Sequence, residues 1–455
     1  MNSYFPKNPL ATLRTDFSHQ RGRFLGKLGA LSSGTILSQA LLLCASPILT
    51  RLYSPSSLGA AAIFTAVLGI LSPAVCGKYE IAVVNSRSLS DARRAFSVAA
   101  RIGLLISLTL MPLIFAVAAI LGNLTDLPAM ETYLYALPFA TAFLGIYTAA
   151  FQYTVRSGSL LTASLSRITH ALAFIVTAIA IKLAWDLNGL IIAVPVAWLA
   201  ALLVLLTPSS RLRLRLFRWF SARDMEVLRS HSRLPKYNAP TAILDGITCA
   251  LPAIAIGFYT DFLTVGYYSL IVRVTLGPLT AVGSAVSTLN QHAIATQIRS
   301  NQSPASHFRK LLAFLLIAAF AIVFLTAGAG PMVFGLLFGA NWEAAGPFLR
   351  VLAPSIAVRF VASTLSSTFG ATGNDRLAAG WRTMAFLATT VTLFALPPPN
   401  TPLALFTRIA LLDAILYTAY LVLAWLCVLP TNFALPRQNK NAQTKPISTS
   451  PNPQF

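Results

Sequence analysis

Long apolar runs constrain this chain of 455 residues more than any other feature, and they recur from about residue 28 to residue 429. A run of about 18 or more apolar residues is long enough to cross the roughly 30 Å hydrocarbon layer of a membrane as a helix. Only 10% of the residues are charged, whereas soluble domains contain about a quarter. Because backbone polar groups in lipid need internal partners, the sequence predicts an all-α, polytopic membrane protein.

Twelve of the runs are long enough to span, and a basic stretch separates the sixth from the seventh. The expected spans are 28–50, 58–84, 96–121, 131–155, 160–182, 187–207, 237–257, 263–297, 308–330, 343–369, 378–396 and 402–429. The expected organisation is an N-terminal segment (1–27), a lobe of six helices (28–210), a basic linker (211–236), a second lobe of six helices (237–429) and a disordered tail (430–455).

The basic residues lie mainly on one side of this arrangement. With the N-terminus inside, 25 of the 34 Lys and Arg residues fall in cytoplasmic segments. The outer loops hold two, Arg51 and Lys182, and the other seven lie within spans. This asymmetry predicts that both termini are cytoplasmic, and it explains most of the net charge of +21 without a nucleic-acid partner.

The linker begins with alternating Arg and apolar residues, "RLRLRLFRWF" (Arg211–Phe220). This pattern is typical of a segment lying under the inner leaflet, and docking of anionic lipid or of a partner protein is the alternative. The four cysteines all lie inside apolar runs and the five histidines are scattered. Neither a disulfide, a metal site nor a cofactor is therefore expected.

The two lobes show a weak internal similarity. "CASPILTRLYSPSSLG" (Cys44–Gly59) aligns with "CALPAIAIGFYTDFLTVG" (Cys249–Gly266) when two residues are inserted. In each stretch a proline lies near the end of the first helix of its lobe, and a glycine opens the next helix. Because six is an even number, both lobes enter the membrane in the same direction, which is a known transporter plan.

The tenth span contains two arginines with different expected roles. Arg359 lies near its middle, and Ser355, Ser363 and Ser366 share its helical face. An arginine at this depth costs at least a few kcal/mol, so it should face the bundle interior or a wet cavity. Arg350 lies near the outer end of the span and can extend its guanidinium to the membrane surface.

Other deep charges extend the candidate site. Arg273 lies about ten residues into the eighth span, which favours a cavity position. Lys78, with Glu80 two residues on, lies toward the inner third of the second span, and Arg408 lies in the outer third of the twelfth. For both, a cavity role and a surface role remain open.

Two acids also lie deep in the expected membrane region. Asp245 and Asp413 either pair with an arginine or carry a proton or Na⁺ for coupling. The deep charges are mainly cationic, which points to an anionic substrate, and guanidinium groups bind phosphate through two parallel hydrogen bonds. The expected substrate-binding set is therefore Arg273, Arg359, Lys78 and Arg408.

Several blocks resemble the Wzx-type polysaccharide flippases of the multidrug/oligosaccharidyl-lipid/polysaccharide exporter superfamily. They are "SPILTRLYSPSSLG", "KYEIAVVNSRSLSDARRAF", "IVRVTLGPLTAVGSAVSTLNQ" and "LLFGANWEAAGPFLRVLAPSIAVRFVASTLSSTF", in this order between residues 28 and 390. One departure is the polar run from Asn290 to His292, where the family usually has a more apolar, aromatic run.

This resemblance implies two six-helix lobes around a cationic central cavity and alternating access. The implied substrate is a polyprenyl-diphosphate-linked oligosaccharide, moved across the bacterial cytoplasmic membrane for polysaccharide or lipopolysaccharide synthesis. Membrane lipids are the other expected partners, and polysaccharide assembly proteins remain an open class of partner. By position, Arg273, Lys78 and Arg359 fall within the family's recognisable blocks.

Two other functions remain as alternatives. An ion-coupled drug exporter of the same superfamily needs deep acids to meet a cation, whereas the deep charges here are mainly basic. A polysaccharide polymerase or glycosyltransferase needs catalytic groups on sizeable outer loops, whereas these loops are short and carry no clustered acids or histidines. The chain is therefore expected to be a transporter and not an enzyme.

Overall fold

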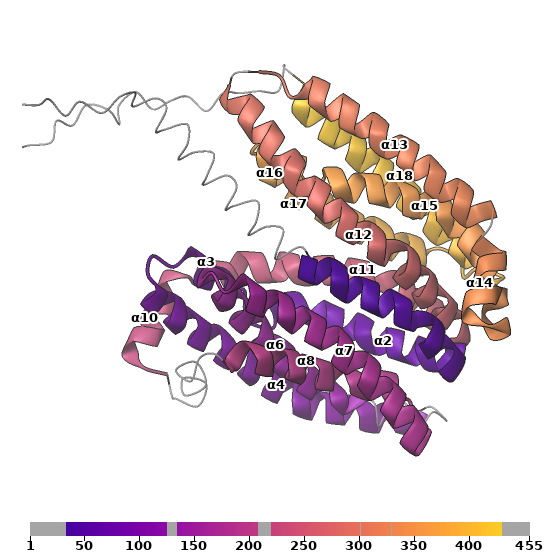
Figure 1. The fold of residues 1–455 in the computed structure, drawn as a ribbon, viewed down its shortest axis with the longest axis horizontal. Helices are drawn as coiled ribbons and strands as arrows, with labels where there is room; N and C mark the ends of the chain where they lie inside the picture. Colours follow the sequence, from indigo (N-terminus) through magenta and orange to yellow (C-terminus); the bar gives the residue numbers. More distant parts are fainter. Residues whose placement is uncertain (1–32, 125–133, 208–219, 301, 329, 430–455) are drawn as a thin grey trace, which may run out of the picture.

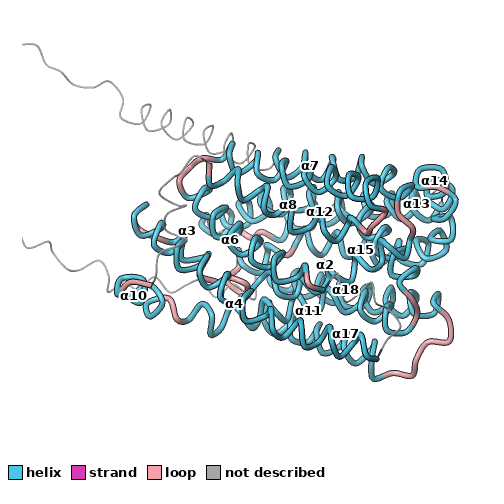
Figure 2. Tube along the Cα trace, turned by 90° about the horizontal axis from the view of Figure 1, so that it is seen from below, coloured by secondary structure: helices cyan, strands magenta, loops and turns pink. Residues whose placement is uncertain are grey.

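The computed structural model describes residues 33–124, 134–207, 220–300, 302–328 and 330–429. Figure 2 shows these residues as helices joined by short loops, with no strand among them. The N-terminal segment 1–27, most of the alternating basic stretch and the tail 430–455 lie outside the described residues, so the predictions made for them stay predictions.

The helices form two lobes that follow each other in sequence. The N-lobe comprises the first helix (Ser33–Leu52), α2 (Pro55–Leu71), η1 (Ser72–Ala74), α3 (Glu80–Asn85), α4 (Leu89–Leu124), α6 (Ala136–Arg156), α7 (Leu160–Trp185) and α8 (Gly189–Leu206). The C-lobe comprises η2 (Leu234–Asn238), α11 (Ala239–Tyr259), α12 (Phe262–Arg299), α13 (Ala305–Gly328), α14 (Gly330–Phe338), η3 (Ala340–Ala345), α15 (Gly346–Leu365), α16 (Ser367–Ala371), α17 (Asp375–Thr390), η4 (Val391–Ala395) and α18 (Pro402–Val428).

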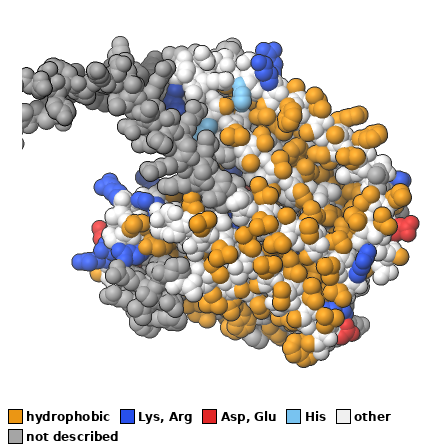
Figure 3. Space-filling model, in the orientation of Figure 1, with side chains coloured by type: hydrophobic (Ala, Val, Ile, Leu, Met, Phe, Trp, Pro, Cys, Tyr) orange, Lys and Arg blue, Asp and Glu red, His pale blue; other side chains and the backbone are white. Residues whose placement is uncertain are grey.

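The two lobes meet at one end of the molecule and separate toward the other (Figure 1). They meet where α2 of the N-lobe packs against α12 of the C-lobe, close to α14. They diverge toward α3, α16 and the linker helix α10 (Ala222–Ser230). This end also carries Arg87, Arg156 and Arg299 and is called the basic end below. Hydrophobic side chains cover most of the face in Figure 3, and Lys and Arg gather at its left edge. The chain is therefore a multi-pass membrane protein.

Eleven helices of the described chain are long and apolar enough to cross a membrane, whereas the sequence predicts twelve. The remaining expected span, 131–155, corresponds to α6, which has 21 residues but a more polar composition that includes two Tyr and three Thr. It packs between α4 and α8 as a member of the bundle. The difference thus concerns hydropathy and not the presence of the helix.

The second span is shorter than predicted. Its helix ends in the turn η1, and a new short helix, α3, begins only at Glu80. Gly77 and Lys78 between them have positive φ angles of 56° and 63°, a backbone conformation that does not continue a helix. The expected helix over 58–84 is therefore wrong beyond Ala74.

The polar run at Asn290 does not interrupt α12, which continues to Arg299. Asn290 is 1% exposed, and its amide nitrogen donates hydrogen bonds to the hydroxyls of Ser367 (3.3 Å) and Thr368 (3.2 Å). Asn290 therefore links α12 to α16 by hydrogen bonds near the basic end.

The contact between the lobes at the opposite end places two backbones together. A Cβ atom added to Gly59 of α2 would clash with the carbonyl oxygen of Phe262, and one added to Gly266 of α12 would clash with that of Pro55. These glycines are the two that the internal alignment matches. Nearby, the buried indole of Trp342 in the C-lobe donates a hydrogen bond to the carbonyl of Thr50 in the N-lobe (2.9 Å).

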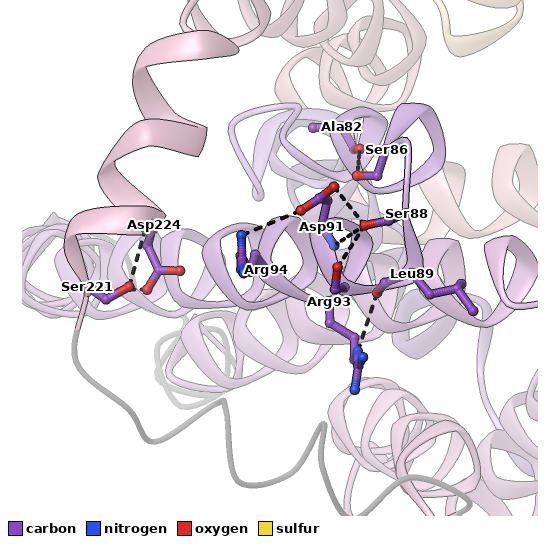
Figure 4. A network of polar contacts seen from close by, with 10 residues as sticks. Ala82, Ser86, Ser88, Leu89, Asp91, Arg93, Arg94, Ser221 and Asp224 are labelled. Atoms are coloured by element: carbon purple, nitrogen blue, oxygen red, sulfur yellow. Dashed lines mark hydrogen bonds and ion pairs between the residues drawn. The ribbon is translucent and has the colours of Figure 1, made fainter. Parts of the chain in front are cut away.

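The described part of the linker docks onto the N-lobe. It forms α10 (Ala222–Ser230), whose first turn carries a capping box between Ser221 and Asp224. Asp224 also accepts a hydrogen bond from buried Arg101 of α4 at 2.9 Å. Figure 4 shows Ser221 and Asp224 beside the first turns of α4, where Ser88 and Asp91 form a second polar cluster.

Hydrogen bonding at this junction controls the ionisation of Asp224. Burial alone raises the pKa of this carboxyl, but hydrogen bonds from Ser221 and Arg101 and the charge of Arg101 outweigh burial. The net result is a pKa below the ordinary value, so the carboxylate form is favoured in the folded protein. The linker helix is therefore fixed to the N-lobe by a charged hydrogen bond.

Candidate functional site

A cavity of 620 Å³ lies between the two lobes and is called the central cavity below. The N-lobe contributes Gln39, Leu42, Leu43, Thr65, Leu68, Gly69, Ser72, Leu144, His170, Phe174, Val194 and Trp198. The C-lobe contributes Val272, Arg273, Leu276, Gly277, Pro278, Thr280 and Arg359. Two arginines and no acid are among these residues. The volume is in the range of ligand pockets, about 300–1,000 Å³.

Arg273 projects into the central cavity from α12. No carboxylate within the described residues forms an ion pair with it, and its side chain is neither fully buried nor exposed. Pro278 lines the cavity one turn further along the same helix. Because proline has no N–H, the carbonyl of Val274 lacks its usual helical partner. The guanidinium of Arg273, which has no acid partner within the described residues, and the carbonyl of Val274, which has no proline N–H to bind, thus belong to neighbouring residues of α12.

A second cavity of 360 Å³ lies inside the C-lobe and is called the C-lobe cavity. Its polar lining includes two acids and two arginines together with hydroxyl groups and aromatic rings. These residues are Asp245, Thr248, Arg359, Ser363, Ser366, Trp381, Arg382, Thr389, Asp413, Tyr417 and Tyr420. The acids and the arginines among these residues are equal in number.

Arg359 borders both cavities. Its Nη1 lies 3.8 Å from Oδ2 of Asp413, and their side chains are 26% and 20% exposed. The guanidinium also lies over the ring of Tyr417, 5.5 Å from its centroid. A weak ion pair and a cation–π contact thus hold Arg359 between the two spaces.

The serine stripe predicted beside Arg359 is partly confirmed. Ser363 and Ser366 line the C-lobe cavity with it, whereas Ser355 is 2% exposed and donates its hydroxyl to the carbonyl of Leu352 within its own helix. Arg350 is exposed on α15 and donates to the carbonyl of Ala327 (3.2 Å). Of the two arginines, Arg359 lines both cavities described here and Arg350 lines neither.

The other two predicted cations, Lys78 and Arg408, are not among the lining residues of the central cavity. Lys78 lies in the break between η1 and α3, 3.8 Å from Glu80. Arg408 donates to the carbonyl of Pro397 (2.9 Å) and lines a separate groove between η4 and α18. Of the acids, Asp413 pairs with Arg359, and Asp245 lies 3.4 Å from Arg382, with both side chains of that pair about half exposed.

The central cavity also contains residues that the sequence analysis did not single out. Gln39, His170 and Trp198 line it from the N-lobe. A polar amide and an imidazole inside long apolar runs are a detectable signal, since polar groups at membrane depth face the bundle interior. Trp198 had no such signal, because aromatic residues are common in any apolar span.

The arrangement favours binding of an anionic group. Arg273 offers five N–H donors and has no acid partner within the described residues. Arg359, which also lines this cavity, offers further N–H donors. The remaining wall is mainly apolar, which lowers the local dielectric and strengthens charge-assisted hydrogen bonds. Within the described residues, no group of three potential metal ligands occurs.

Solved transporter structures share this fold. The lipid II flippase MurJ in an inward closed conformation matches with a TM-score of 0.71 and 14% identity, covering 87% of each chain. An inward-facing multidrug resistance MATE transporter matches with a TM-score of 0.64 and 14% identity, covering 86% of this chain and 94% of that one. A Pyrococcus furiosus transporter, described as having a binding pocket of reverse polarity, matches with a TM-score of 0.58 and 14% identity over 88% and 95%.

Sequence comparison identifies the protein family of the chain. No curated protein matches the chain in sequence. A family model for polysaccharide biosynthesis proteins matches residues 48–347, which include α2, α3, the linker helix and Arg273. The match covers well over half of the chain, and the solved structures with the same fold are transporters of the multidrug/oligosaccharidyl-lipid/polysaccharide superfamily. The chain therefore belongs to the polysaccharide biosynthesis protein family and has the fold of that transporter superfamily.

Proposed function

We propose that the protein is a flippase that moves polyprenyl-diphosphate-linked oligosaccharide units across the bacterial cytoplasmic membrane for polysaccharide synthesis. The observation that carries the proposal is the central cavity, whose charged lining residues are Arg273, which has no acid partner within the described residues, and Arg359, which pairs with Asp413. A diphosphate has two anionic groups that a guanidinium can bind in pairs of hydrogen bonds. The family match supports a role in polysaccharide synthesis.

The orientation follows from the positive charges. The lobes diverge at the basic end, and the positive-inside rule assigns that end to the cytoplasm. The conformation is then inward-open, and both termini are cytoplasmic. The sugar head enters between the lobes from the cytoplasm while the polyprenyl chain stays in lipid, and the lobes then rotate so that the head leaves on the other side.

Asp413 and Asp245 are the candidates for ion coupling. Asp413 lies 3.8 Å from Arg359, so a proton or Na⁺ on Asp413 weakens that pair and leaves Arg359 available to an anion. Linkage is reciprocal: an anion held by Arg359 lowers its attraction for Asp413 and favours cation binding there. Asp245 would contribute through its contact with Arg382 in the same cavity.

An ion-coupled drug exporter is the second candidate, because the C-lobe cavity contains two acids and MATE transporters share the fold. A cationic drug would have to bind there, since the central cavity offers it only arginines among its charged lining residues. A membrane polymerase or glycosyltransferase receives no support from the solved structures named above, which are of transporters.

The test replaces Arg273 with Ala in cells that lack the native protein. Surface polysaccharide should fall at unchanged protein level, whereas Arg350→Ala, a matched control on the exposed face of α15, should retain it. Normal polysaccharide from Arg273→Ala would contradict the proposal. Drug resistance that Arg273→Ala leaves intact and Asp413→Asn removes would favour the exporter.

A further inference from the structure

The N-lobe wall of the central cavity carries an aromatic pair. His170 of α7 and Trp198 of α8 both line the cavity, and their ring centroids are 4.1 Å apart at an angle of 48°. Both side chains are half-buried, so part of each ring faces the cavity. The two rings belong to the N-lobe side of the cavity, whereas Arg273 and Arg359 belong to its C-lobe side.

A buried residue supports this pair from behind. Tyr147 of α6 is 7% exposed, and its ring lies 4.9 Å from that of Trp198. The Tyr147 hydroxyl is within 3.4 Å of the Ser166 hydroxyl, which links α6 to α7. Packing of this kind fixes the indole in one orientation, so that a ligand loses little free energy in ordering it.

The polar N-lobe side chains that line the cavity with the two rings, Gln39, Thr65 and Ser72, carry no charge, whereas Arg167 lies behind the rings beside Tyr147. Within the described residues, no group accepts a hydrogen bond from the indole N–H of Trp198, and the ring nitrogens of His170 have no hydrogen-bond partner. Gln39 of the first helix is exposed to the cavity, and its side-chain oxygen lies near Gly277 of α12, 3.7 Å from where a Cβ would be. An amide both donates and accepts hydrogen bonds.

These features match the chemistry of a sugar ring. A pyranose has a C–H face that packs on an aromatic plane and a rim of hydroxyl or acetamido groups that need neutral donors and acceptors. An aromatic ring with a polar N–H serves both requirements. The arginines on the C-lobe side of the cavity serve a different group, because their charge is best used on phosphate.

We propose that Trp198, with His170 and Gln39, is the subsite for the first sugar of the lipid-linked substrate. The sugar ring packs on Trp198 while the diphosphate binds Arg273 and Arg359 on the C-lobe side. This inference rests on the proposed flippase function and adds that the two lobes bind different parts of the substrate. The C-lobe binds the part that all such lipids share, and the N-lobe discriminates the sugar.

The test measures binding of four lipids to the purified full chain in nanodiscs. They are undecaprenyl diphosphate and the same lipid carrying one glucose, galactose or N-acetylglucosamine. Trp198→Ala should weaken the best sugar-bearing lipid about tenfold, or about 1.4 kcal/mol, and leave the sugar-free lipid unchanged. Trp198→Phe, which keeps a ring and loses the N–H, should show a smaller loss. Trp185→Ala, an exposed tryptophan at the end of α7, is the matched control.

The outcomes separate this inference from the function on which it rests. Equal weakening of all four lipids by Trp198→Ala would indicate a structural role and overturn the subsite. Wild-type protein that binds no sugar-bearing lipid better than undecaprenyl diphosphate, while Arg273→Ala still weakens binding, would overturn the subsite alone. Wild-type protein that binds none of the four would overturn the proposed function itself.

Discussion

The central cavity and the C-lobe cavity share Arg359 and differ in their other charges. The central cavity has arginines without acids, and the C-lobe cavity has two acids and two arginines. A site that binds an anion needs the first arrangement, because an internal acid would compete for the guanidinium. A site that exchanges a cation needs the second, since its carboxylates must be occupied when the cation is absent. The difference shows that the balance of acidic and basic lining residues distinguishes the expected roles of the two cavities more clearly than their volumes do.

The largest expected effect comes from the shared residue. Arg359→Ala leaves Asp413 without its partner at membrane depth, and breaking such a pair costs roughly 3–5 kcal/mol. We expect a lower melting temperature in detergent and less folded protein in the membrane. Arg359→Ala combined with Asp413→Asn should recover stability but not transport. Recovery of transport as well would show that Arg359 serves only its pair.

The next effect tests whether the central cavity recognises geometry or only charge. Arg273→Lys keeps the charge but loses the planar fork that binds two oxygens. Transport should fall about tenfold, as expected for the loss of roughly 1.4 kcal/mol, and should stay above that of Arg273→Ala. Initial rates with a labelled lipid in liposomes give the measurement. Full transport activity of Arg273→Lys would show that the site needs only a positive charge at this position.

A charged contact outside both cavities provides a reference. Asp224→Asn removes the ionised partner of Arg101, and a hydrogen bond to a charged group contributes about 1.5–3 kcal/mol. Because the folded pKa of Asp224 is lowered, its contribution is complete above the ordinary carboxyl pKa and is lost as the pH falls through the folded value. The wild type and Asp224→Asn should therefore differ in melting temperature at pH 7 and approach each other as the pH falls below the ordinary carboxyl pKa toward the lower folded value. A constant difference would exclude ionisation as its source.

The smallest expected change is at Asp245. Its pair with Arg382 is about half exposed, and exposed pairs contribute about 0–1 kcal/mol. Asp245→Asn should scarcely change stability, and comparison with Asp413→Asn then shows which acid couples an ion. If transport driven by a proton or Na⁺ gradient is lost only in Asp413→Asn, the pair at Arg359 is the coupling site. If gradient-driven transport is lost only in Asp245→Asn, the pair of Asp245 and Arg382 is the coupling site.

Much of the fold could be predicted from the sequence because long apolar runs in lipid have one solution. In the C-lobe, α11, α12, α13 and α18 begin and end within a few residues of predicted spans, as do α15 with α16 and α17 with η4, whereas α14 was not predicted. The break at Gly77 was missed because the apolar run continues past it, although the glycine was visible. The difference between Arg273 and Arg359 was also hidden, since the partner of Arg359 lies 54 positions away on another helix. The Trp198 surface depends on packing from Tyr147, which no local pattern reveals.

The close approach of Gly59 and Gly266 has a mechanical consequence. Two helix backbones in contact have no interlocking side chains at that point, so one can roll on the other without rotamer changes. The internal alignment matches these two glycines, so the same position of each half lies at this contact. A methyl group at either position would clash with the facing backbone and force α2 and α12, and with them the two lobes, apart.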